Sequence, residues 1–196
     1  MSKTILWIDV ETTGLNPILH EIIEIAILPE RGGELLEPFV AQVRPERVKQ
    51  INPSALEVNG FTQEEIMGFP SRNNAYSRMI PYLREVERHP IDMVLAGHNL
   101  AFDVAFLQRF YWDCALDHFS LATARRWDTY SVASALQLAG LPMPDRLSLG
   151  ALAEHFGVKQ ERAHRALDDA KTARAVWWAM IDQIREPFKT GGVYRP

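Results

Sequence analysis

The chain has 196 residues, of which 47% are hydrophobic and 23% charged, and its formal net charge is −4 at pH 7. This composition is typical of an ordinary soluble domain, and no apolar stretch approaches the roughly 20 residues of a membrane-spanning helix. The charge argues against a protein that coats long nucleic acid by bulk attraction, although not against one that grips a chain end. The lone cysteine, Cys114, excludes an internal disulfide and a cysteine metal cluster, so we expect a cytoplasmic protein with no membrane partner.

Strand-like segments open the chain. Residues 4–11 are rich in branched and aromatic side chains and end at a Thr-Thr-Gly turn. Residues 21–28 and 37–45 follow at distances typical of hairpins, with a turn between them at residues 29–34. The three segments predict an antiparallel meander.

The later part of the chain alternates helices with short strands. Residues 53–87 have a helical pattern, and the apolar run at residues 91–99 predicts a buried strand. A helix follows that run, with Asn99 as its predicted N-cap. One more strand is predicted near residues 127–130, and helices account for the rest to about residue 185.

This order of elements predicts an α/β fold. We expect a mixed sheet of about five strands, an antiparallel meander plus parallel strands, flanked by helices. No repeat, low-complexity tract or linker interrupts the chain. The prediction is therefore one domain at residues 1–185, followed by a C-terminal tail at residues 186–196.

Two carboxylates lie where the first strand ends. Side chains alternate along a strand, so Asp9 and Glu11 point to the same side, with their Cα atoms about 6.5 Å apart. The preceding residues are apolar on both faces, which places the acids at the end of a buried strand. Buried like charges need compensation, and hard oxygen ligands suit Mg²⁺ or Mn²⁺. For this pair alone, a strand that runs out into solvent is the alternative.

Two further acids lie near the starts of helices. Asp103 falls in the first turns of the helix after the buried strand, where an acid can also serve the helix dipole alone. On a helical wheel, Asp169 lies at the edge of an apolar stripe, whereas Asp168 lies on the other side. We therefore expect Asp169 to face the sheet, with His164 at the helix start and close to the same place.

Three motifs in this order resemble those of the DEDDh (DnaQ-like) 3′–5′ exonucleases. They are IDVETTGL, GHNLAFD and HRALDDA, which begin at Ile8, Gly97 and His164. The resemblance spans about residues 4–180 and points to the side of the family that holds RNase T and the proofreading subunits of replicative polymerases. It implies a ribonuclease-H-like fold.

The resemblance also implies a reaction and a site. The implied reaction removes nucleoside 5′-monophosphates from the 3′ end of single-stranded DNA or RNA. Two divalent cations, Mg²⁺ or Mn²⁺, would be held in each site by Asp9, Glu11, Asp103 and Asp169, with His164 as the general base. The residues expected to contact substrate are Thr12, Thr13, Gly14 and Leu15 after the first motif, with Phe61 and Phe102 as faces on which bases stack. For both phenylalanines, core packing is the alternative.

Other functions of the same fold stay open from the sequence. One is a catalytically silent nucleic-acid-binding module, and another is an endonuclease. The chain also leaves open a polymerase partner, a preference for DNA or RNA, and a homodimer of the RNase T type. In such a dimer a basic patch would feed the partner's site, and its candidate residues here are Arg125, Arg126, Arg146 and Arg165.

Overall fold

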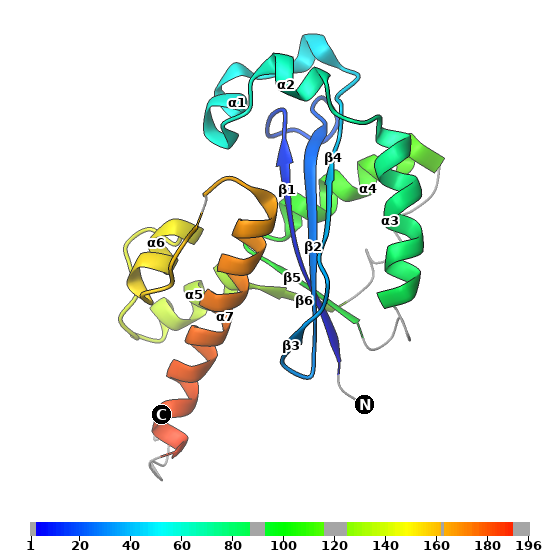
Figure 1. Cartoon of the computed structure of the whole chain (residues 1–196). Helices are drawn as coiled ribbons and strands as arrows, with labels where there is room; N and C mark the ends of the chain where they lie inside the picture. Colours follow the sequence, from blue (N-terminus) through cyan, green and yellow to red (C-terminus); the bar gives the residue numbers. More distant parts are fainter. Residues whose placement is uncertain (1–2, 87–92, 116–124, 162, 190–196) are drawn as a thin grey trace.

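The computed structural model describes residues 3–86, 93–115, 125–161 and 163–189. Within these residues, six strands form a mixed sheet in the order β3-β2-β1-β5-β6, with β4 also paired to β2 (Figure 1). β1 lies at the centre, antiparallel to β2 and parallel to β5. The strands are β1 Thr4–Thr12, β2 Ile22–Arg31, β3 Glu34–Leu35, β4 Phe39–Gln42, β5 Met93–Gly97 and β6 Arg125–Asp128.

Helices cover both faces of the sheet. α7 lies on one face together with α5 and α6, α3 and α4 lie on the other, and α1 and α2 lie beyond the end of β1 (Figure 1). Among the described residues, no helix is both long and apolar enough to cross a membrane. The helices are α1 Pro53–Asn59, α2 Gln63–Met67, α3 Arg72–Val86, α4 Ala101–Ala115, α5 Thr129–Leu138, α6 Leu149–His155 and α7 Ala166–Lys189, with a 3₁₀ turn, η1, at Val48–Gln50.

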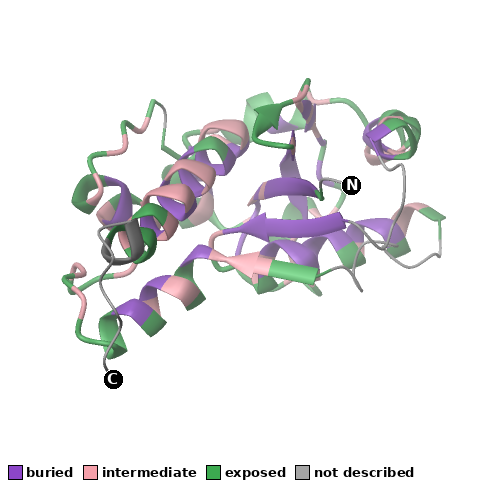
Figure 2. Ribbon diagram, turned by 90° about the horizontal axis from the view of Figure 1, so that it is seen from below, coloured by how far each residue is buried: buried purple, intermediate pink, exposed green. Residues whose placement is uncertain are grey.

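β1 is buried along most of its length, as its apolar residues predict. The centre of the sheet is accordingly drawn in the colour of buried residues (Figure 2). Ile5 and Trp7 pack with Ala170 and Trp177 of α7. The alternate side chains of β1 join the core beneath α3 and α4: Leu6, Ile8 and Val10. Because side chains alternate, Asp9 and Glu11 continue the face that α7 covers.

The predicted α/β architecture is confirmed, with its meander and its parallel pairs, β1 with β5 and β5 with β6. Some boundaries differ from the prediction. β2 continues to Arg31, and the turn narrows to Gly32 and Gly33, which have φ of 63° and 89°. α7 continues to Lys189, which lies within the predicted tail.

One strand boundary and one helix cap around the ends of β5 and β6 differ from the prediction. The strand predicted near residues 127–130 is present as β6. β6 ends at Asp128, and the next residue begins α5, because the Asp128 side chain accepts a hydrogen bond from the Tyr130 N–H and caps that helix. Asn99 does not cap α4, which begins at Ala101. Instead Asn99 adopts a left-handed conformation (φ 56°), which asparagine tolerates, and its N–H donates to Asp128.

Candidate active site

An acid cluster lies at the end of β1. Asp9, Glu11 and Asp169 each place one carboxylate oxygen within 4.8 Å of the others. Asp169 stands in the first turn of α7 and is only 8% exposed, so it faces the sheet as the helical wheel predicts. Asp168 instead pairs with Lys171 on the helix.

Asp103 reaches the same strand from α4. The pairing of β1 with β5 extends only to Trp7 and Ala96, and β5 then ends at Gly97. A Cβ on Gly97 would lie 2.8 Å from the carbonyl oxygen of Ile8, so glycine permits this close approach. Beyond that point, Oδ1 of Asp103 accepts a hydrogen bond of 3.0 Å from the backbone N–H of Val10. The Asp103 carboxylate thus occupies the edge of β1 that β5 leaves uncovered.

Burial and mutual repulsion oppose ionisation of the first acid pair. Burial, followed by the charges of Asp103, Glu11 and Asp169, raises the pKa of Asp9 well above its ordinary value. Burial, then Asp169 and Glu24, raises the pKa of Glu11 to about 7. The protein therefore supplies too little positive charge near Asp9 and Glu11 to balance their two negative charges.

The pKa values of Asp103 and Asp169 are also raised, but each of these carboxylates accepts hydrogen bonds that partly offset the rise. Burial raises the pKa of Asp103, and the Val10 N–H acts against it. Burial also raises the pKa of Asp169, and hydrogen bonds from Gln160 and the His164 N–H act against it. Convergent hard oxygens with too little compensating charge are the donor set that Mg²⁺ or Mn²⁺ prefers, so the residues fit such cations.

His164 lies at the rim of the cluster, two residues before α7. Its side chain is exposed, and its backbone is left-handed with φ 63°. The His164 N–H donates to Oδ2 of Asp169 at 3.0 Å, while Nε2 of Gln160 donates to Oδ1 at 3.0 Å. Gln160 has no signal in the sequence, because it lies in a loop with no periodic pattern.

A fifth carboxylate, Glu24, also lies at the site and was missed from the sequence. It is opposite Glu11 in the β1–β2 register and is 2% exposed. Its signal in the sequence is an acid between Ile23 and Ile25, within an otherwise apolar run at residues 22–29. Arg165 donates to both oxygens of Glu24, at 2.7 and 3.3 Å. Arg165 is therefore paired with a buried acid, while its own side chain stays 37% exposed.

The threonine hydroxyls where β1 ends form hydrogen bonds with backbone groups of the protein. Thr12 is hydrogen-bonded to the carbonyl of Gly14, and the hydroxyl of Thr13 accepts from the N–H of Glu21. A Cβ on Gly14 would lie 2.5 Å from the His20 ring, so a larger residue would displace that ring. Leu15 is 79% exposed. Of these four residues, Leu15 presents the side chain that is open to a ligand.

Both candidate stacking residues are partly buried. Phe61 packs edge-on to Phe69, with ring centroids 5.3 Å apart, and the Arg165 guanidinium lies 4.9 Å from the Phe61 centroid. Phe102 lies 4.7 Å from Phe106. Each phenylalanine thus has the core contacts of the packing alternative.

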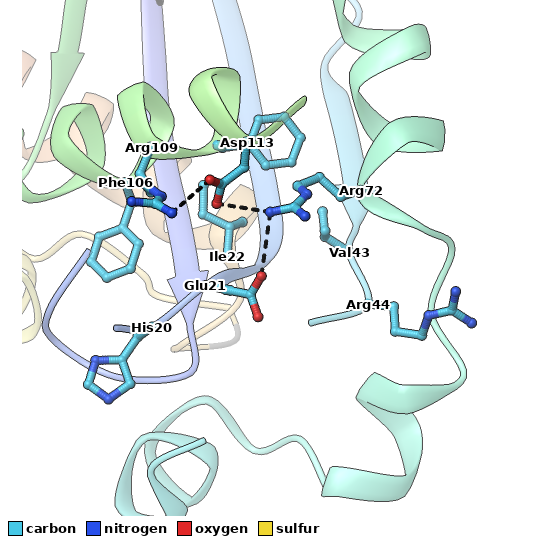
Figure 3. Close-up of a pocket in the computed structure, with 10 residues that line it drawn as sticks. His20, Glu21, Ile22, Val43, Arg44, Arg72, Phe106, Arg109 and Asp113 are labelled. Carbon is cyan, nitrogen blue, oxygen red and sulfur yellow. Dashed lines mark hydrogen bonds and ion pairs between the residues drawn. The ribbon is translucent and has the colours of Figure 1, made fainter. Parts of the chain in front are cut away.

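A second charged cluster joins α4 to α3 and β2 (Figure 3). Asp113 pairs with Arg47, Arg72 and Arg109 at 2.8 to 2.9 Å, and Arg72 also reaches Glu21 at 3.6 Å. The cavity beside it has a volume of about 10 Å³, room for no more than about one water molecule. These charges serve the packing of the fold.

Comparison with known sequences places the chain among exonucleases. The sequence profile of the exonuclease family RNase_T matches residues 6–177. DNA polymerase III PolC-type of Thermotoga maritima is 26% identical over 183 residues, which are 93% of this chain and 12% of that protein. The Clostridium perfringens PolC-type polymerase is 28% identical over 180 residues, 91% of this chain and 11% of that protein. The chain thus spans about an eighth of the length of these relatives.

Comparison with solved structures shows the same fold. E. coli exonuclease I in complex with a dT13 oligonucleotide has a TM-score of 0.78 at 21% identity, over 96% of this chain and 43% of that one. A second structure of exonuclease I has a TM-score of 0.77 at 21% identity, over 94% of this chain and 42% of that one. These matches confirm the ribonuclease-H-like architecture. With the profile match over most of its length, the chain belongs to the RNase_T exonuclease family, and its resemblance to the DEDDh exonucleases is confirmed.

Proposed function

We propose that this exonuclease degrades single-stranded nucleic acid from the 3′ end, with two Mg²⁺ or Mn²⁺ ions, and releases nucleoside 5′-monophosphates. The observation that carries the proposal is the convergence of Asp9, Glu11 and Asp169 within 4.8 Å, from segments far apart in the sequence. The solved complex of E. coli exonuclease I with an oligonucleotide supports single-stranded DNA as one substrate. We take residues 1–185 as the catalytic domain.

The four acids are proposed as the cation ligands. Asp9 and Glu11 project from the strand end, Asp169 faces them from α7, and Asp103 reaches the uncovered edge of β1 from α4. When bound, a pair of divalent cations activates a water molecule and stabilises charge on the leaving oxygen. In the protein without cations, burial and neighbouring acids raise the pKa values of Asp9 and Glu11. Positive charge from bound cations would stabilise the ionised form of both carboxylates.

His164 is proposed as the general base. Its exposed side chain lies at the rim, and its backbone N–H donates to Oδ2 of Asp169, so the main chain that carries the imidazole is tied to a proposed cation ligand. Imidazole is the side chain best suited to accept a proton near neutral pH. A silent binding module is disfavoured because the chain retains all five residues of the motif set.

The 3′-terminal nucleotide is proposed to lie against the loop after β1. Leu15 is exposed there and offers an apolar contact to a base, and the partly exposed edge of Phe102 offers another. The PolC-type relatives support a polymerase partner as one setting for the activity. A homodimer is the setting that RNase T-like enzymes suggest.

The test uses 5′-labelled DNA and RNA oligomers with free or blocked 3′ ends, incubated with Mg²⁺, Mn²⁺ or EDTA. We expect a ladder that shortens from the free 3′ end and stops with EDTA or a blocked end. A closed circular single strand serves as the control, because only an endonuclease would cut it. Cleavage of the circle, or no shortening with either cation, would contradict the proposed function.

A further inference from the structure

The turn that carries His164 has an unfavourable backbone. Its φ of 63° is left-handed, a conformation that residues other than glycine adopt rarely and at a cost. Such a conformation persists only when the surroundings hold it. The structure therefore must contain contacts that keep His164 in place.

Contacts on three successive residues hold this turn. The His164 N–H donates to Asp169 at 3.0 Å. The Arg165 side chain donates to both oxygens of Glu24, and the Ala166 N–H donates to Oε2 of Glu24 at 3.0 Å. Two of the three anchored residues thus depend on one buried carboxylate of β2.

We propose that Glu24 and Arg165 are positioning residues that fix His164 over the acid cluster. The inference rests on the proposed role of His164 as general base. Glu24 connects the turn to the strand opposite Glu11, so the base and the cation ligands share one rigid support. A misplacement of about 1 Å can cost about a hundredfold in rate, so such a support has a measurable kinetic effect.

Glu24 is unsuited to be a further cation ligand. Oε1 accepts from Nη2 of Arg165, and Oε2 accepts from Nε of Arg165 and from the Ala166 N–H. Its charge is balanced by the guanidinium, whereas Asp9 and Glu11 have raised pKa values. The Arg165 guanidinium also lies over the Phe61 ring, so it joins the turn before α7 to the segment between α1 and α2.

The chain provides a matched control on the same strand. Glu30 is 1% exposed and accepts from Nε and Nη2 of Arg174 at 2.9 and 3.2 Å. Its other partners are the indole N–H groups of Trp7 and Trp178, and none of these residues belongs to the acid cluster. Glu24→Gln and Glu30→Gln therefore remove the same charge from similar buried pairs, one at the site and one away from it.

The kinetic test is a double-mutant cycle with Mg²⁺ or Mn²⁺ and a 3′-end-labelled oligonucleotide. We expect Glu24→Gln to lower kcat by roughly 10- to 100-fold with unchanged KM, and Arg165→Gln to do the same. In a His164→Ala background, Glu24→Gln should leave kcat unchanged, because it acts through a side chain that is absent. Glu30→Gln should leave kcat unchanged in both backgrounds.

A second measurement does not depend on activity. In the cation-free protein, amide hydrogen exchange at His164 and Ala166 should be slow and should accelerate in Glu24→Gln. Glu30→Gln should not accelerate it. Arg165→Gln removes a side chain that is 37% exposed and provides a second variant if Glu24→Gln folds poorly.

The outcomes separate the two proposals. An equal loss of kcat from Glu24→Gln with and without His164, or an equal loss from Glu30→Gln, would overturn the positioning role while the exonuclease assignment stands. Unchanged exchange at His164 in both Glu24→Gln and Arg165→Gln would also overturn it. A wild-type protein that shortens no oligonucleotide would overturn the proposed function and, with it, this inference.

Discussion

The two ends of β2 each bury a glutamate, and their surroundings differ. At Glu30, burial acts to raise the pKa, but hydrogen bonds from Arg174, Trp7 and Trp178 outweigh it and hold the pKa below its ordinary value. At Glu24, one arginine lies beside the acid cluster, where the pKa values of Asp9 and Glu11 are raised. The far end is fully compensated and stabilises the fold, whereas the site end retains negative charge that a ligand can neutralise.

The largest effect should come from Asp9→Asn. We expect activity on oligonucleotides to fall below detection, because the proposed cation site would lose one of its carboxylate ligands. In EDTA, the same variant should be more stable than wild type, since it removes a buried and repelled charge worth about 1.4 kcal/mol for each pKa unit. Thermal melts in EDTA check the predicted gain in stability. A melting temperature below that of wild type would contradict the view that the site end of β2 lies beside uncompensated negative charge.

His164→Ala should be next in size. We expect kcat to fall by ~10²–10⁴-fold, because the attacking water loses its proton acceptor. Cation binding measured by calorimetry with Mn²⁺ should be retained, since the His164 contact with Asp169 comes from the backbone. An unchanged rate together with normal cation binding would refute the role of His164.

Glu30→Ala should show the opposite pattern to the site variants. It leaves Arg174 and two indole N–H groups without their buried acceptor, and breaking such a buried pair costs about 3–5 kcal/mol. Denaturant unfolding measures this loss of free energy of unfolding. The kcat of the folded protein should stay at the wild-type value, and a large decrease would show that the two ends are not independent.

Cations should stabilise the protein through the acid cluster and not through Glu30. At a concentration of one hundred times Kd, a cation bound only to the folded state adds about 2.7 kcal/mol. We expect Mg²⁺ or Mn²⁺ to raise the melting temperature of wild type and of Glu30→Gln by similar amounts. Asp9→Asn should show no such rise, and a full rise in that variant would place the cations elsewhere.

The pH dependence of stability should have opposite signs at the two ends. The pKa of Glu11 rises on folding from 4.5 to about 7, so its contribution to stability is lost as pH increases across that interval. The pKa of Glu30 is lowered on folding, so its contribution is present above its ordinary pKa and is lost as pH falls below it. Unfolding in EDTA across pH should show Glu11→Gln flattening the upper interval and Glu30→Gln the lower one.

Local patterns in the sequence predicted the positions of several acids of the site. Asp9 and Glu11 are two residues apart on a strand whose apolar faces are both visible in the sequence, and both lie at its end in the structure. The helical wheel placed Asp169, rather than Asp168, toward the sheet. These inferences worked because a strand repeats every two residues and a helix every 3.6, whatever surrounds them.

Contacts between distant residues were beyond such patterns. Glu24 and Arg165 are separated by 141 positions, and no periodicity connects them. Arg165 was therefore assigned to a surface patch, and Gln160, nine positions before Asp169 in an irregular loop, was not identified. The sequence favours Asn99 as a helix cap, because the bond from its N–H to Asp128, 29 positions away, follows no local pattern.

The sequence by itself determined the α/β class, the order of the three motifs and which acids face the sheet, because each follows from spacing along one element. Only the tertiary structure decided which donors surround those acids. The register of β1 with β2 sets Glu24 opposite Glu11, and the end of β5 at Gly97 leaves the edge of β1 to Asp103. These pairings arise from the packing of separate segments, and packing depends on the whole chain rather than on local spacing.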